Sequence, residues 1–150
     1  SSDASREQCN NAGADLVVDH PSDESVSEIL DYTDGKKIDR IIEGDFGANL
    51  LPVLEVLKVG GTIATYSSMT DMNPSIPFVR MMFMDITIRM VLVYEMPEEA
   101  KEHAAKDITT MLGQNRFDNR VAKEYSLDDI ASAHTLIESG KPHGSVIIKP

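Results

Sequence analysis

Apolar positions along this chain alternate between short runs rich in β-branched residues and longer stretches with helical spacing. The short runs predict buried strands and fall at Leu16–Val18, Ile38–Ile42, Thr62–Tyr66 and Ile86–Tyr94. The helical stretches lie before or between them, at Ser5–Ala12, Glu24–Tyr32 and Asn49–Val59. Glycine follows each predicted helix, where a left-handed residue satisfies the last carbonyl groups. Strands that alternate with helices predict a parallel sheet with right-handed crossovers.

The pattern changes after Tyr66. The segment Ser67–Phe78 contains two prolines and several small polar residues, so it is expected to form a loop. A long helix is expected at about Pro97–Asn115, because apolar residues recur there on one helical face. Methionines cluster around this loop, and they are expected to fill the core or to line an apolar substrate mouth. The cluster consists of Met69, Met72, Met81, Met82 and Met84.

Size and composition exclude several classes of protein. With 150 residues, of which 41% are hydrophobic, the chain is long enough for one domain with a buried core. No apolar run approaches the roughly 20 residues that cross a bilayer, and no signal peptide is visible. The single cysteine, Cys9, favours a reducing, cytoplasmic location. The net charge of −11 argues against nucleic acid or an anionic membrane as a partner.

The C-terminal segment carries the most specific pattern. Residues Tyr125–His134 read Y-S-L-D-D-I-A-S-A-H and predict a helix with Ser126 as its N-cap and Asp129 completing a capping box. A glycine turn and the apolar strand Val146–Ile148 follow this helix. The block resembles the C-terminus of medium-chain dehydrogenase/reductases, and most closely that of the zinc-independent NADPH:quinone oxidoreductases.

The resemblance implies an α/β fold, a Rossmann-type doubly wound parallel sheet that is incomplete at its N-terminus. The G-x-G-x-x-G turn that binds pyrophosphate is absent from the sequence, and Ser1 aligns with the end of the family's second strand. Residues 1–150 would then be a partial dinucleotide-binding domain, with about 120–150 returning toward a catalytic domain upstream. In the strand order 3-2-1-4-5-6, Ile86–Tyr94 is the outer edge strand, through which relatives form homodimers.

The resemblance also implies contacts to the 2′-phosphate of NADP(H). The stretch Gly13–His20 resembles the family's "G-A-x-x-V-x-N-[YH]" strand, whose last residue lies against this phosphate. Serines and a basic residue after the second strand bind the same group in the family. Hydroxyl, guanidinium and imidazole groups suit a dianion. The corresponding residues here are Ser1, Ser2, Ser5, Arg6 and His20.

Three further segments match positions around the rest of the cofactor. Asn49 matches an asparagine that contacts the cofactor, and it is also expected to be a helix N-cap. The family's "V-x-G-S" stretch beside the ribose and nicotinamide corresponds to Thr65, Tyr66, Ser67 and Ser68, with Tyr66 in place of a small glycine. The backbone that binds the nicotinamide carboxamide corresponds to Met90, Val91 and Leu92.

The activity that the resemblance implies is hydride transfer from NADPH to a quinone or another electrophilic alkene or carbonyl compound. No residue of this chain is expected to be a catalytic acid or base, because the nicotinamide carries the chemistry and the protein positions it. No residue is expected to be a metal ligand, because the one cysteine and four histidines lack ligand spacing. The chain alone is expected to be inactive. Alternatives are a zinc-dependent alcohol dehydrogenase, the enoyl-reductase domain of a synthase, and a nucleotide-binding or dimerising module without turnover. A Rossmann-like methyltransferase, which usually has an antiparallel C-terminal hairpin, fits the closing block less well.

Overall fold

A computed structural model describes residues 3–19, 23–116, 120–142 and 144–150. The chain divides into two compact units, one running from Leu16 to Glu102 and the other made of the residues up to Asp15 together with those from His103 onward. Each unit has its own parallel sheet. The parallel pairing agrees with the alternating pattern, which had predicted a single sheet. Among the described residues, no helix is long and apolar enough to cross a membrane.

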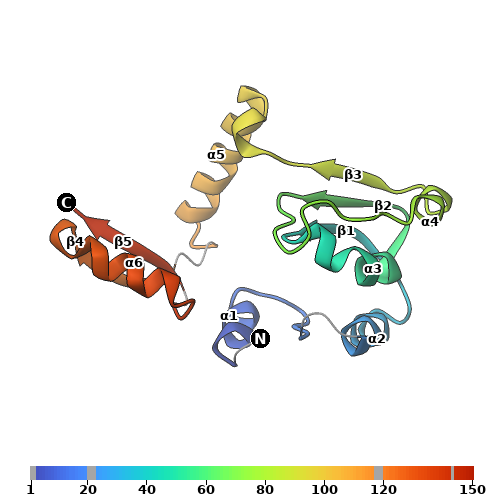
Figure 1. Ribbon diagram of the computed structural model, residues 1–150, viewed down its shortest axis with the longest axis horizontal. Helices are drawn as coiled ribbons and strands as arrows, with labels where there is room; N and C mark the ends of the chain where they lie inside the picture. The colour runs from blue at the N-terminus through green and yellow to red at the C-terminus, as the bar shows by residue number, and fades with distance from the viewer. Residues whose placement is uncertain (1–2, 20–22, 117–119, 143) are drawn as a thin grey trace. The chain divides into compact units, whose positions relative to one another are not determined.

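The sheet of the first unit contains β1 (Ile38–Glu43), β2 (Leu57–Thr65) and β3 (Thr87–Met90), in that order (Figure 1). Both pairings are parallel. Glu43 is opposite Thr65, and Thr65 is opposite Met90, so the carboxyl ends of all three strands are level. Ligands of open parallel sheets bind beyond this end of the strands.

Two helices pack beside this sheet. Helix α3 (Phe46–Val56) contacts β1 and β2, and α2 (Asp23–Tyr32) contacts α3 (Figure 1). The core between α3 and the sheet includes the fully buried side chains of Leu54, Leu57 and Ile63. Ile42, in contrast, is 81% exposed, although a doubly wound sheet carries helices on both faces. Edge strand β1 therefore has apolar surface that no described element covers.

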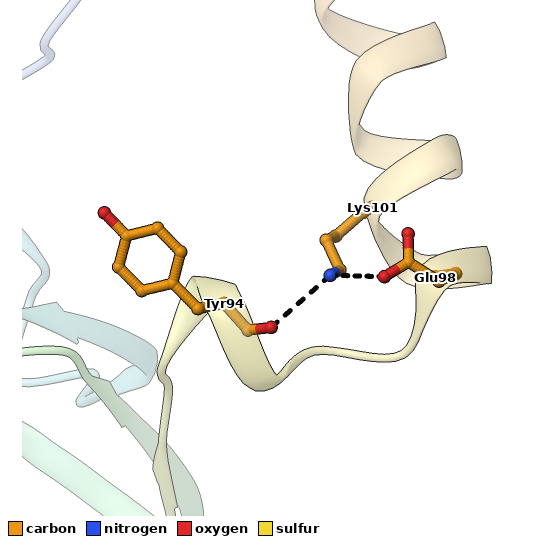
Figure 2. Close-up of polar contacts among 3 residues, drawn as sticks. All are labelled: Tyr94, Glu98 and Lys101. Atoms are coloured by element: carbon orange, nitrogen blue, oxygen red, sulfur yellow. Dashed lines mark hydrogen bonds and ion pairs between the residues drawn. The ribbon is translucent and has the colours of Figure 1, made fainter.

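Short elements flank β3. Helix α4 (Phe78–Phe83) precedes the strand, and the 3-10 turn η1 (Val93–Glu95) follows it. Helix α5 (Glu98–Gly113) begins with the salt bridge that Lys101 Nζ makes to Glu98 Oε1, at 2.6 Å. The same ammonium group donates to the carbonyl oxygen of Tyr94 at 3.4 Å (Figure 2). Lys101 thus joins the first turn of α5 to the turn that follows β3.

The second unit contains α1 (Asp3–Asn11) and a β-α-β segment. This segment comprises β4 (Val121–Ser126), the 3-10 turn η2 (Leu127–Asp129), α6 (Ile130–Glu138) and β5 (Ser145–Lys149). Strands β4 and β5 pair in parallel, with α6 as the crossover between them. The antiparallel hairpin of the methyltransferase alternative is therefore not formed here.

The predicted capping box is wrong in its hydrogen bonds. Ser126 does precede a helical turn, but its side chain makes no bond to a backbone N–H. The Ser126 hydroxyl donates instead to Asp129 Oδ2, at 2.8 Å. A 3-10 turn separates Ser126 from α6, so the serine is not at the end of the α-helix as the capping box requires.

Two predicted strands differ from the structure. Residues Leu16–Val18 belong to neither sheet, because the second strand of the Rossmann order, beside which they would pair, is not among the described residues. The predicted strand Ile86–Tyr94 is reduced to the four residues of β3. Its neighbour β2 ends at Thr65, whose carbonyl oxygen accepts a last hydrogen bond from the Val91 N–H at 2.7 Å. Beyond that bond no described strand pairs with the segment, which turns into η1.

The predicted helix Asn49–Val59 is displaced. Helix α3 begins at Phe46 and ends at Val56, and Gly60 lies within β2 instead of closing the helix. The helix starts early because the next loop supplies acceptors for its first N–H groups. It ends early because Leu57 pairs with Ile38 and enters the core. Helix α4 was not predicted. It is short and begins after Pro77, at the end of the predicted loop Ser67–Phe78.

Candidate functional site

A cavity of about 620 Å³ lies at the carboxyl ends of β2 and β3. Its volume is in the range of sites for small molecules and cofactors. Strand ends, the start of α3 and the loop after β2 form its walls. The lining residues are Phe46, Thr65, Tyr66, Ser67, Ser68, Met72, Asn73, Pro74, Ile76, Met90, Val91 and Leu92.

The cavity combines an apolar wall with a few neutral hydrogen-bonding groups. None of the described residues that line it is an aspartate, glutamate, lysine, arginine or histidine. The hydroxyl groups of Ser67 and Ser68 and the amide of Asn73 supply polarity, whereas Phe46 and Ile76 supply apolar surface. Such a lining suits an uncharged planar ring that carries a carboxamide, and it would leave a phosphate without a counter-charge.

The structure brings together two predicted segments that are far apart in the sequence. Thr65, Tyr66, Ser67 and Ser68 form one part of the lining, and Met90, Val91 and Leu92 form another. They meet because Thr65 and Met90 are directly opposite each other in the parallel register of β2 and β3. Their grouping in one cavity is an observation, whereas their role in cofactor binding stays a prediction.

Asn49 lies beneath this region and not in the lining. It sits inside α3 and is 6% exposed, so the prediction that it is the N-cap is wrong; Asp45 holds that position. Its Nδ2 donates to Glu43 Oε1 at 2.7 Å, while its Oδ1 has no hydrogen-bond partner among the described residues. Glu43 also accepts the backbone N–H of Asp45, at 2.6 Å.

Several residues of this region were not among the site residues predicted from the sequence. Phe46, Asn73, Pro74 and Ile76 line the cavity, and buried Glu43 supports it. An acidic residue that directly follows the apolar run Ile38–Ile42 was the available signal for Glu43. The methionine cluster meets the expectation only in part, because Met72 lines the cavity and Met81 is buried in the core, whereas Met69 and Met82 are exposed outside the lining.

The structure describes two members of the predicted 2′-phosphate set. Ser1, Ser2 and His20 lie outside the described residues. Ser5 and Arg6 lie half-buried on α1, in the other compact unit from the cavity. Their role toward a 2′-phosphate stays a prediction.

Charged residues gather at the opposite end of β1. A second hollow of about 660 Å³ is bordered there by Lys36, Lys37 and Arg40, and by Asp34 and Asp39. The hydrogen bond from Lys58 lowers the pKa of the Asp39 carboxyl below its ordinary value, but both side chains are exposed. Solvent screens such a pair, and it lies away from the strand ends that form the cavity.

The donor side chains that the structure describes do not form a zinc site. Within the described part of the chain, no three His, Cys, Asp or Glu side chains gather closely enough to hold a metal ion. Cys9 is exposed on α1, and a zinc site needs at least three protein ligands around one point. That the chain binds no zinc stays a prediction.

Residues 12–148 match the sequence profile of the zinc-binding dehydrogenase family. The chain belongs to this family. The match agrees with the resemblance seen in the C-terminal block and confirms the predicted membership of the medium-chain dehydrogenase/reductases. No curated protein sequence matches the chain.

Solved structures of other dehydrogenases and reductases share the fold. A mycobacterial quinone oxidoreductase has a TM-score of 0.86 at 24% identity, over 100% of this chain and 47% of its own. A mycobacterial protein solved in complex with NADPH has a TM-score of 0.82 at 22% identity, over 100% of this chain and 48% of its own. An NAD-dependent alcohol dehydrogenase has a TM-score of 0.80 at 18% identity, over 99% of this chain and 42% of its own. The chain thus spans about half the length of these structures, and the predicted Rossmann-type fold is confirmed.

Proposed function

We propose that this chain is the cofactor-binding part of an oxidoreductase that transfers hydride from NADPH to a quinone or another electrophilic alkene or carbonyl compound. The observation that carries the proposal is the cavity at the carboxyl ends of β2 and β3, with its uncharged lining. The family match supports a dehydrogenase or reductase, and the fold of the NADPH-complexed mycobacterial protein supports this cofactor.

The free polar groups of the cavity suit the nicotinamide end of the cofactor. The Ser67 hydroxyl and the Asn73 side-chain amide line the cavity and make no hydrogen bond to another described residue. They can therefore pair with a carboxamide, and Phe46 and Met90, which line the same cavity, would hold the ring. Bound NADPH supplies the hydride, and these residues bind the ring, orient it and exclude water.

Preference for NADPH over NADH rests on the predicted 2′-phosphate set, Ser1, Ser2, Ser5, Arg6 and His20. The test is a titration of the full-length protein with both cofactors, followed by the fluorescence of the reduced nicotinamide. NADPH should bind more tightly, and Arg6→Ala should weaken NADPH binding by about 1.5–3 kcal/mol, the contribution of a hydrogen bond to a charged group. Arg116→Ala, which removes an exposed arginine outside this set, is the matched control. Equal or tighter binding of NADH would contradict the assignment.

The substrate is proposed to be a small molecule. The protein is proposed to lie in the cytoplasm and to have neither nucleic acid nor a membrane as a partner. A zinc-dependent alcohol dehydrogenase is the second candidate, favoured by the fold shared with the NAD-dependent enzyme. Turnover assays separate the two, because reduction of quinones or enones that persists after chelation excludes a catalytic zinc. Tight NADPH binding without turnover of either substrate class by the full-length protein would instead favour a nucleotide-binding module.

A further inference from the structure

The amino end of α3 and the loop after β2 satisfy each other's hydrogen bonds. Asp45 is the N-cap residue of α3, yet its side chain makes no bond to the first N–H groups of the helix. The loop supplies those acceptors instead. The N–H of Phe46 donates to the carbonyl oxygen of Ser67 at 3.0 Å, and the N–H of Gly47 donates to Ser68 Oγ at 2.9 Å. The loop therefore caps the helix.

The Asp45 carboxylate binds the loop in return. Its Oδ1 accepts the backbone N–H of Thr70 at 3.2 Å, and its Oδ2 accepts the Thr70 hydroxyl. The Ser68 hydroxyl extends the network by donating to the carbonyl oxygen of Asp71. The two Thr70 bonds share the carboxylate as acceptor, and bonds to a carboxylate are about twice as strong as neutral ones.

Gly47 allows the loop to lie directly on the helix backbone. A Cβ at this position would be 2.6 Å from the carbonyl oxygen of Asp71 and 2.9 Å from Ser68 Oγ. Any side chain larger than hydrogen would therefore push the loop away. Packing alone does not hold the loop, because Met69 and Met72 are 75% and 72% exposed. Hydrogen bonds and close approach to Gly47 thus determine where the loop lies.

The same loop forms one wall of the cavity, to which it contributes Ser68, Met72, Asn73, Pro74 and Ile76. We propose that Asp45 and Gly47 are positioning residues that hold this wall in its binding conformation before the nicotinamide arrives. The proposal rests on the proposed function for the identity of the ligand. If the loop is already ordered, binding does not carry the entropic cost of ordering it, and the affinity is higher.

The test compares three variants of the full-length protein with two matched controls. Asp45→Ala removes both acceptors of the Thr70 bonds, and Asp45→Asn keeps one carbonyl acceptor. Gly47→Ala removes no hydrogen-bonding group and acts only by displacing the loop. Asp39→Ala removes an exposed carboxylate that pairs with Lys58. Gly113→Ala adds a methyl group where no atom lies within 4 Å.

Two readouts are needed: amide hydrogen exchange of residues 67–77, and NADPH affinity from nicotinamide fluorescence. Asp45→Ala and Gly47→Ala should accelerate exchange in this segment and leave β2 protected, because only the loop is released. Each should raise the Kd for NADPH about tenfold, as expected for the loss of about 1.4 kcal/mol. Asp45→Asn should fall between Asp45→Ala and the wild type, and both controls should match the wild type.

The outcomes separate this proposal from the proposed function. Unchanged exchange at 67–77 overturns the positioning role, and so does faster exchange with unchanged NADPH affinity. Exchange that rises equally in β2 and in the loop also overturns it, because that result means general destabilisation. If the wild type binds no NADPH but the loop exchange responds selectively, the proposed cofactor is wrong, whereas the role of Asp45 and Gly47 in holding the cavity wall is supported.

Discussion

Glu43 is a buried carboxylate at the end of β1, 7% exposed, and it connects two elements of the site. Its Oε1 accepts both the Asp45 backbone N–H and the Asn49 side-chain amide. Buried ionisable groups persist where they satisfy donors that would otherwise be unpaired. Glu43 thus fixes the turn from β1 into α3, on which the loop and the cavity wall then depend.

Removal of this carboxylate should destabilise the protein. Glu43→Ala leaves the Asp45 N–H and the Asn49 amide without an acceptor, so the free energy of unfolding should fall by about 1–3 kcal/mol. Urea denaturation measures this change. Glu55→Ala is the control, because Glu55 forms an exposed ion pair with Arg80 and should contribute about 0–1 kcal/mol. Equal losses for the two variants would mean that Glu43 has no structural role of its own.

At the scale of elements, α3 connects the core to the site. Its inner face carries Leu50 and Leu54, one turn apart, both buried against the sheet, and its first turn carries Phe46 into the cavity. Leu51, next in sequence to Leu50, points the other way and is 60% exposed. Packing of α3 in the core therefore fixes where Phe46 lies in the cavity wall.

The two faces of α3 should respond differently to the same substitution. Leu54→Ala leaves a cavity in the core and should lower the free energy of unfolding by about 2–5 kcal/mol. Leu51→Ala, on the same helix, should change it by less than about 0.5 kcal/mol. Chemical denaturation of both variants is the measurement. A large loss for Leu51→Ala would indicate that another part of the protein covers this residue.

At the scale of the whole molecule, both outer strands of the larger sheet have an edge that no described strand pairs. On the β3 side the flanking residues Val93 and Tyr94 are exposed as well. Unpaired edges of this kind favour pairing with another chain. We therefore propose a homodimer through the segment Ile86–Tyr94, with β3 at its centre and the two sheets continuous across a two-fold axis.

The oligomeric state tests this proposal. Light scattering on a dilution series of the full-length protein should give the mass of a dimer. Thr87→Lys places a charge on exposed β3, where two copies would face each other, and should raise the dimer dissociation constant about tenfold. Thr109→Lys adds the same charge on α5 and should have no effect. A monomer that persists at all concentrations would refute edge pairing.

The type and order of most elements followed from the sequence alone. Apolar patterns located α2, α5, β1, β2 and β5, because the spacing of apolar residues follows the period of the local backbone, and the closing Gly13 indicated α1. The C-terminal block indicated the family, and the order of motifs assigned Thr65–Ser68 and Met90–Leu92 to one ligand site. Parallel register then brought these two segments into one cavity.

The tertiary structure decided where elements end and which hydrogen bonds hold the site in place. Strand β3 stops at Met90 because its partner β2 stops at Thr65, and Leu16–Val18 is no strand because no described strand lies beside it. Helix α3 begins at Phe46 because residues far along the chain, Ser67 and Ser68, accept its first hydrogen bonds. Local sequence determines which conformations a segment favours, whereas a hydrogen bond between distant segments exists only after the chain has folded.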